Sequence, residues 1–277
     1  MTRHVVAMLT SFNRRSMTVD CIDALLRQKS DVSRLDIVLV DDGSTDGTAA
    51  AIAKRFPSVE IVPGGGLYWA RGMARAESVA ATLRPDYFLW VNDDAALGSH
   101  AIASLISCAE SEGRPTIVVG SVVDPETSSI TYGGLKIRSR MPLRLELVGP
   151  VPAKQFVDTF NGNLVLVPAA AARTLVGIDS SFGHHYADWD YGLRASKLGI
   201  PIVVAPGILG TTARNSPIGT YHDATLSRGR RLRLLLGPKG LPPRDQARFL
   251  ARHGGPLWQL QWAWAYFKFA CQIAVAR

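Results

Sequence analysis

A chain of 277 residues with 47% hydrophobic and 19% charged residues can bury one large core, which argues against an intrinsically disordered protein. The net charge of +8 lies near the C-terminus. Residues 224–277 hold ten of the 31 Lys and Arg but only one of the 23 acids, so the rest of the chain is nearly neutral at −1. The near-neutral charge of residues 1–223 argues against a nucleic-acid-binding protein, because such a protein would carry basic residues across its binding surface.

Short β-branched runs alternate with helical stretches through the first 120 residues. The expected strands are 4–10, 35–42, 59–63, 86–91 and 116–120, and the expected helices are 16–28, 47–56, 71–83 and 98–111. Alternating elements of this length are typical of βαβ units, in which helices cover both faces of a mostly parallel sheet. The sequence therefore predicts an α/β fold.

After this region the alternation gives way to a segment rich in Gly and Pro, which favours hairpins and loops. Further strands are expected at 161–168 and 201–206, and a helix is expected at 188–199. The chain is predicted to have two parts, a large domain over 1–215 and a basic, amphipathic helical segment over 216–277.

Polar or glycine-rich clusters follow four of the predicted strands. They are Thr10–Arg14, Asp41–Asp46, Gly64–Trp69 and Asn92–Asp94. Ligands bind at the carboxyl ends of the strands in such a sheet, near the point where strand order reverses. We therefore expect all four clusters at one edge, which is the predicted position of the site.

Two adjacent acids, Asp41 and Asp42, end the second predicted strand and precede a turn-rich sequence. A carboxylate at a strand end can accept hydrogen bonds from a base or a ribose, as in dinucleotide folds. The alternative is a turn followed by a helix N-cap at Thr45 or Asp46. The chain has neither a Gly-x-Gly-x-x-Gly fingerprint nor a P-loop, so a phosphate must be bound in another way.

The apolar run that ends in Asn92, Asp93 and Asp94 offers such a way. Hard divalent cations such as Mg²⁺ or Mn²⁺ are held by one or two carboxylates together with phosphate oxygens and water. A bound cation would therefore link these acids to a diphosphate. The alternative is that the acids are solvated loop residues that cap the following helix.

Five segments in order resemble the signature of the family two glycosyltransferases: LTSFNR, VLVDDGSTDGT, GGGLYWARG, FLWVNDDA and YADWDYGLRASKLG. The resemblance covers roughly residues 4–205. It implies an inverting enzyme of the GT-A type, with a mostly parallel sheet flanked by helices and a C-terminal helical appendage. The part over 1–215 would then be the nucleotide-sugar-binding and catalytic domain.

The resemblance also implies which residues bind the nucleotide. Thr10, Asn13 and Arg14 would lie beside it. Asp42 would contact the base or the ribose, with Asp41 buried as its neighbour.

The metal motif of this family has the form Asp-x-Asp, and Asp94 would fill its last position, with Asp93 on the donor side. Asn92 stands where the first Asp usually stands. The implied cofactor is Mg²⁺ or Mn²⁺. Gly66 and Trp69 are also expected at the donor, because glycines allow close approach and an aromatic ring supplies stacking area. Alternatively, Trp69 belongs to the core.

Matching Arg194 to a Leu-Arg segment of the family puts Asp188 at the position of the catalytic base. Inversion needs one general base to deprotonate the acceptor hydroxyl. The alternative is that Asp188 is an N-cap. Asp190 is expected to stabilise the first helical turn or to pair with Arg194 at i+4. His184 and His185 are expected either to line the acceptor pocket or to face solvent.

The resemblance indicates transfer of a sugar from a nucleoside diphosphate donor to a hydroxyl of a glycan or lipid-linked acceptor. Similarity of GLYWARGM and YADWDYGLR to rhamnosyltransferases of the family favours dTDP-rhamnose, with a UDP-sugar as the alternative. Two other functions are considered. A nucleotidyltransferase would show a glycine-rich loop with basic residues after the first strand, and a nucleic-acid-binding protein would be basic across its body.

The C-terminal tail over 253–277 is an apolar, Trp-rich segment whose polar residues Gln261, Lys268 and Gln272 fall in one helical stripe. These residues and Gln259 disfavour a transmembrane span. The helix is expected either to pack against the domain or a second subunit, or to dock on an anionic membrane surface through its aromatic and basic side chains.

The three cysteines, Cys21, Cys108 and Cys271, are far apart and odd in number, so we expect reduced thiols. The N-terminal apolar run is too short for a secretory signal peptide. We therefore expect a cytoplasmic protein, with peripheral contact at the inner face of the plasma membrane if the tail docks there.

Overall fold

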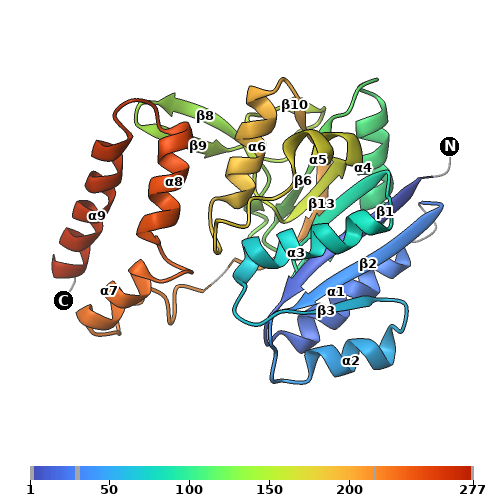
Figure 1. Cartoon of the computed structure of the whole chain (residues 1–277), viewed down its shortest axis with the longest axis horizontal. Helices are drawn as coiled ribbons and strands as arrows, with labels where there is room; N and C mark the ends of the chain where they lie inside the picture. The colour runs from blue at the N-terminus through green and yellow to red at the C-terminus, as the bar shows by residue number, and fades with distance from the viewer. Residues whose placement is uncertain (1–2, 29–31, 215, 276–277) are drawn as a thin grey trace.

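A mixed sheet of ten strands forms the centre of the protein in this computed structural model, which describes residues 3–28, 32–214 and 216–275 (Figure 1). The strand order is β10-β13-β6-β12-β4-β1-β2-β3, with β5 beside β13 and β7 beside β6. The strands are β1 (His4–Ser11), β2 (Arg34–Asp41), β3 (Glu60–Pro63), β4 (Tyr87–Val91), β5 (Ala96–Leu97), β6 (Ile117–Val123), β7 (Ile130–Tyr132), β10 (Gln155–Phe156), β12 (Leu164–Pro168) and β13 (Ile202–Thr211).

The register of the parallel strands brings the predicted clusters together. β4, β1, β2 and β3 run parallel, and in this register Ser11 lies beside Asp41 and Asp41 beside Pro63. These strands therefore end at one edge of the sheet. β12 is antiparallel and lies between β4 and β6. The prediction of an α/β sheet flanked by helices is confirmed.

Helices cover both faces of the sheet because alternate strand residues point to opposite sides. Val6 and Met8 of β1 pack on the face covered by α3, α5 and α6, whereas Val5 and Leu9 pack on the face covered by α1, α2 and α4. The helices are α1 (Arg15–Arg27), α2 (Thr48–Arg55), α3 (Tyr68–Thr82), α4 (Ala101–Glu110), α5 (Ala169–Leu175) and α6 (Ala187–Lys197).

A small second sheet and three helices complete the described part of the chain. The sheet has the order β11 (Thr159–Phe160), β8 (Gly134–Arg140), β9 (Leu143–Leu147) and matches the predicted hairpin region. In Figure 1 the β8–β9 hairpin extends towards the C-terminal helices. These helices are α7 (Arg228–Leu236), α8 (Pro243–His253) and α9 (Trp258–Val275).

The C-terminal segment over 216–277 packs on the rest of the molecule through α8 and one face of α9. The Gln261 side chain accepts a hydrogen bond from the Leu143 backbone N–H at 2.9 Å and donates one to its carbonyl at 3.0 Å. The Trp262 indole N–H donates to the Pro243 carbonyl at 3.1 Å. Gln261 of the predicted polar stripe therefore faces the β8–β9 hairpin.

The opposite face of α9 is apolar and exposed. Leu260, Trp264 and Phe267 of this face have exposed fractions of 67%, 64% and 60%, and Leu257, just before α9, is 58% exposed. The Gln272 side chain lies outside the described residues. No helix in the described part of the chain is both long enough and apolar enough to cross a bilayer.

Candidate functional site

A cavity of about 1340 Å³ lies at the edge where the parallel strands end. The elements around it include the loops after β1, β2 and β4, the start of α3, the start of α6 and the segment that contains α7 and α8. The predicted site residues that line it are Thr10, Arg14, Asp42, Gly66, Trp69, Asp93, Asp94 and Asp188.

Asn13 is not among the lining residues. It is exposed and has a left-handed backbone, with φ of +52°. Its side-chain oxygen accepts a hydrogen bond from the Thr45 backbone N–H at 2.7 Å, and its own N–H donates to the Ser44 hydroxyl at 2.9 Å. In the structure Asn13 thus ties the β1 and β2 loops together, and its place beside the nucleotide stays a prediction.

Asp42 is buried and organises the glycine-rich loop before α3. One carboxylate oxygen accepts hydrogen bonds from the N–H groups of Gly65 and Leu67 at 2.9 and 2.7 Å, and the other accepts from Tyr68 at 2.9 Å. The expectation that Asp41 is the buried neighbour is wrong. Asp41 is only half-buried, because the backbone amides of the loop close over Asp42 instead.

Asp93 and Asp94 form an acid pair that is held by Arg14. One Arg14 nitrogen, Nη1, lies 3.0 Å from Asp93 Oδ1 and 2.8 Å from Asp94 Oδ2. Burial raises the pKa of Asp93, and the Arg14 charge opposes that shift. The helix-capping alternative does not hold for these acids, because α4 begins after His100.

The other two oxygens of the acid pair suit a cation. Asp93 Oδ2 and Asp94 Oδ1 are buried, and neither has a hydrogen-bond partner among the described residues. Unsatisfied carboxylate oxygens in a cavity are hard ligands of the kind that Mg²⁺ and Mn²⁺ prefer. The described residues contain no group of three or more His, Cys, Asp or Glu that could hold a metal. A cation here would complete its coordination with diphosphate oxygens and water.

Trp69 both lines the cavity and packs on the core. Its indole N–H donates to Asn92 Oδ1 at 2.9 Å, and its ring lies edge-on to Trp90 with centroids 6.1 Å apart. A Cβ atom at Gly162 would lie 2.5 Å from the Trp69 ring, so glycine is needed there. Asn92, at the first position of the metal motif, therefore uses its side-chain oxygen to hold Trp69.

Asp188 is the second residue of α6 and lines the cavity. Its carboxylate accepts hydrogen bonds from the backbone N–H of Gly162 at 3.0 Å and of Trp189 at 2.8 Å. The N-cap position belongs to Tyr186, which excludes the N-cap alternative. Burial raises the pKa of Asp188, and the two backbone amides lower it. A carboxylate with a raised pKa is a stronger base than an ordinary one.

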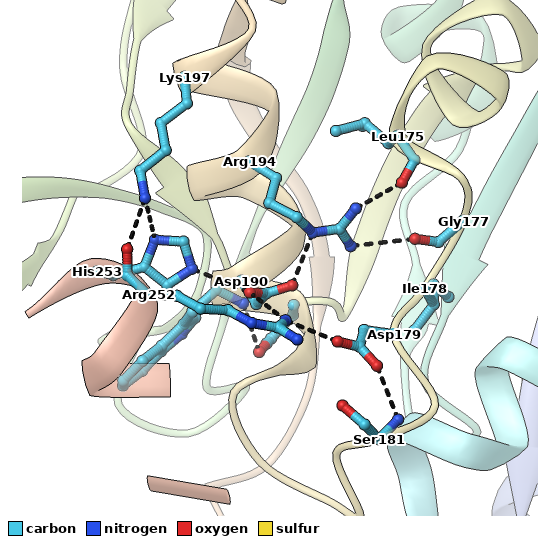
Figure 2. A network of polar contacts seen from close by, with 12 residues as sticks. Leu175, Gly177, Ile178, Asp179, Ser181, Asp190, Arg194, Lys197, Arg252 and His253 are labelled. Atoms are coloured by element: carbon cyan, nitrogen blue, oxygen red, sulfur yellow. Dashed lines mark hydrogen bonds and ion pairs between the residues drawn. The ribbon is translucent and has the colours of Figure 1, made fainter. Parts of the chain in front are cut away.

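Asp190 lies at the centre of a separate network, which Figure 2 shows. It is fully buried and accepts from Arg194 Nε at 2.7 Å, as the i+4 spacing predicts. Arg252 and His253 of α8 also reach it, at 3.1 and 2.9 Å. These two partners were missed by sequence reasoning, since no local pattern connects residues about sixty positions apart. Burial opposes ionisation, but hydrogen bonds from His253 and Arg194 lower the pKa of Asp190 to about 2.

The C-terminal segment contributes cavity residues that sequence reasoning did not find. Tyr221, His222, Arg233 and Lys239 all line the cavity. The basic run was visible in the sequence, but its charge alone did not indicate that part of it faces the site. Within the described residues, the site therefore extends across the predicted boundary at residue 215.

The comparisons with known proteins identify the family. Residues 7–160, more than half of the chain, match the family model Glycosyl transferase family 2. The chain belongs to this family. Family membership confirms the resemblance that the sequence showed, and it disfavours the nucleotidyltransferase and nucleic-acid-binding alternatives.

A curated relative and several solved structures are also similar to this chain. The N-acetylglucosaminyl-diphospho-decaprenol L-rhamnosyltransferase of Mycobacterium tuberculosis H37Rv is 25% identical over 197 residues, which cover 62% of this chain and 64% of that relative. The chain thus spans less than two thirds of the relative's length.

Two solved structures show the same fold. The mannosyltransferase PcManGT from Pyrobaculum calidifontis, in complex with GDP-Man and Mn²⁺, has a TM-score of 0.58 at 17% identity and covers 99% of this chain and 74% of its own. S. aureus TarS 1–349, in complex with UDP, has a TM-score of 0.57 at 13% identity, and the match covers 90% of this chain and 71% of the TarS chain. These similarities support the GT-A type of architecture.

Proposed function

We propose that this family two member is an inverting glycosyltransferase that moves a sugar from a nucleoside diphosphate donor to a hydroxyl of a glycan or lipid-linked acceptor. One observation carries the proposal: a single cavity contains the acid pair Asp93 and Asp94 and, on a different element, the Asp188 carboxylate. Direct displacement needs one site for the donor diphosphate and a separate base for the acceptor.

In the proposed reaction, the acceptor hydroxyl oxygen attacks the anomeric carbon on the face opposite the diphosphate. The bond from that carbon to the diphosphate oxygen breaks as the new glycosidic bond forms, and its electron pair leaves with the diphosphate. Asp188 takes the proton of the hydroxyl. This sequence requires no covalent enzyme intermediate, so no Ser or Cys nucleophile is needed.

Asp93 and Asp94 would hold Mg²⁺ or Mn²⁺ through their two buried, unpaired oxygens. When bound, the cation offsets the negative charge that develops on the leaving diphosphate. Arg14 fixes the orientation of both carboxylates through their remaining oxygens. The Mn²⁺ in the PcManGT complex supports the use of a divalent cation in this fold.

The donor is proposed to be dTDP-rhamnose, with a UDP-sugar as the alternative. The rhamnosyltransferase named among the relatives supports the first choice and a lipid-linked acceptor, while the UDP in the TarS complex supports the second. A panel of nucleoside diphosphate sugars, screened for thermal stabilisation with and without Mn²⁺, tests the proposal, because a specific ligand raises stability by mass action. If no nucleotide sugar stabilises the protein, the proposed function is wrong.

Replacing Asp94 with alanine is expected to remove the metal-dependent part of nucleoside diphosphate binding, because this change deletes one of the two unpaired oxygens of the acid pair. A loss of affinity on the order of tenfold or more is expected, which corresponds to about 1.4 kcal/mol. Calorimetry of UDP and dTDP with and without Mn²⁺ measures it. Asp20→Ala, which changes an exposed acid of α1 outside the cavity, is the control. Equal metal dependence in both variants would rule out the acid pair as the cation site.

Peripheral membrane contact is proposed to occur through the outward face of α9. This face presents Trp264 and Phe267, and residues 224–277 around it carry ten Lys and Arg and one acid. Exposed aromatic side chains beside basic residues suit an anionic lipid surface, near which each cation contributes about 1 kcal/mol. Such contact would place the cavity close to a lipid-linked acceptor.

A double variant, Trp264→Ser with Phe267→Ser, is expected to lose most of the flotation of the full chain with anionic liposomes at low salt. Val176→Ser is the matched control, because Val176 is 90% exposed but lies on the helix α5 side of the molecule. If the unmodified protein does not float, the proposed membrane contact is wrong. Sedimentation velocity of the same proteins then shows whether the α9 face instead forms a homodimer.

A further inference from the structure

The turn between α7 and α8 holds a lysine at the cavity. The N–H of Gly240 donates to the Gly237 carbonyl at 2.9 Å, and the N–H of Leu241 donates to the Leu235 carbonyl at 2.5 Å. A Cβ atom at Gly240 would lie 2.3 Å from the carbonyl oxygens of Leu234 and Leu235, so only glycine allows this close approach. Lys239 therefore projects from a turn that is closed tightly on the end of α7, and it lines the cavity.

Lys239 has no ion pair or hydrogen bond with any other described residue. This distinguishes it from Arg14, another cation that lines the cavity, which is neutralised by Asp93 and Asp94. A lysine that only stabilised the end of α7 would donate to the last helical carbonyls, and no such bond is present within the described residues. The charge of Lys239 is therefore available to a ligand.

The electrostatic environment of His184 also indicates that the charge of Lys239 acts inside the cavity. Burial and the charges of His185, Lys239 and Arg14 together lower the pKa of His184 to about 3. Lys239 and Arg14, from opposite ends of the chain, thus lie close enough to act on one imidazole. The His184 Nδ1 atom accepts a long hydrogen bond from the Trp69 backbone N–H at 3.4 Å, and the indole N–H of the same Trp69 donates to Asn92, which precedes the acid pair. The charges of Lys239 and Arg14 at this part of the cavity favour an anionic ligand.

We propose that Lys239 is a diphosphate-binding residue that the C-terminal segment contributes to the cavity. This inference rests on the proposed function, in which a diphosphate is the anion that both reaction partners can supply. The ammonium group of lysine is a compact point charge that suits phosphate oxygens. One source of the diphosphate is the nucleotide of the donor, and the other is the lipid-linked diphosphate of an acceptor.

The test compares Lys239→Gln with Lys268→Gln, which changes an exposed lysine of α9 outside the cavity. If the donor supplies the diphosphate, Lys239→Gln should bind UDP and dTDP roughly 10–100-fold more weakly, as expected for the loss of one charged hydrogen bond. Uridine, which has no phosphate, should bind unmodified protein and variant equally. Lys239→Arg, which keeps the charge, should restore most of the affinity.

If the acceptor supplies the diphosphate, nucleotide binding should be unchanged in Lys239→Gln. The KM for a lipid diphosphate acceptor should then rise, while the KM for a phosphate-free glycoside acceptor stays the same. Unchanged nucleotide affinity together with unchanged KM for both acceptors overturns the proposal. Binding of inorganic pyrophosphate to the unmodified protein and to Lys239→Gln is measured in parallel. This measurement decides the role of Lys239 even if no nucleotide sugar binds and the proposed function fails.

Discussion

Replacing Asp188 with asparagine is expected to leave a folded protein that binds its donor but transfers sugar roughly 10²–10⁴-fold more slowly. The amide has the size of the carboxylate but cannot take the acceptor proton. Its oxygen can still accept one of the two backbone hydrogen bonds, from Gly162 or Trp189, that hold Asp188. Losing the other costs about 1–3 kcal/mol at most.

The pH dependence of transfer gives a second measure of the same role. A base must be deprotonated to act, so the rate rises as the pH increases through the pKa of Asp188. Because burial raises that pKa above its ordinary value of 3.8, the acidic limb should lie above the normal range of an aspartate. This limb should be absent from the residual activity of Asp188→Asn, while calorimetric donor affinity stays unchanged.

Near-normal turnover of Asp188→Asn would show that another group is the base. Asp190, two residues further on, is the nearest acid in sequence, but it is fully buried and does not line the cavity. His185 lines the cavity and would become the next candidate. Loss of the remaining turnover in the double variant Asp188→Asn with His185→Gln would support that reassignment.

Local patterns predicted the α/β fold because it is built from contiguous runs. Each strand from β1 to β4 is a short apolar run with a polar or glycine-rich cluster at its end. Each intervening helix shows apolar residues at the helical period. β12 was predicted as a strand, but its antiparallel place between β4 and β6 was not. Strand order depends on contacts between distant segments, which no local pattern contains.

For the site, too, local patterns predicted some features, whereas others depend on contacts between distant segments. Residues at strand ends were predicted together, because parallel strands deliver their carboxyl ends to one edge. The hydrogen bond from Trp69 to Asn92 was not predicted, and neither were the three hydrogen bonds that backbone amides donate to Asp42. Each of these bonds depends on how a loop closes. Lys239 was placed in the basic C-terminal segment over 216–277 by composition, and only the packing of α7 and α8 brings it to the cavity.

Replacing Asp190 with asparagine is expected to lower the free energy of unfolding by about 3 kcal/mol. Removing one partner of a buried ion pair costs roughly 3–5 kcal/mol, because the remaining charge is left without compensation. We expect the lower end of this energy range because the Arg194 and Arg252 side chains are 24% and 39% exposed, so water screens part of their charge. Denaturation in urea measures the change, with Asp23→Asn as the control.

Asp23 is a suitable control because it also pairs with two arginines, Arg27 and Arg55, but at the surface. Its replacement should cost no more than about 1 kcal/mol. The pH dependence separates the two sites further. The pKa of Asp190 is lowered from 3.8 to about 2, so its stabilisation is complete above 3.8 and is lost as the pH falls towards 2. Asp190→Asn should lose this dependence between pH 4 and 2.

Asp188 and Asp190 lie on opposite sides of the first turn of α6, because two residues of an α-helix span about 200°. One side faces the cavity, and the other meets Arg252 and His253 of α8. Asp190→Asn should therefore loosen the contact between α6 and the C-terminal helices, while its transfer rate per folded molecule at low temperature stays within a fewfold of the unmodified protein. If Asp190→Asn is as stable as Asp23→Asn, the network in Figure 2 does not hold the C-terminal helices in place.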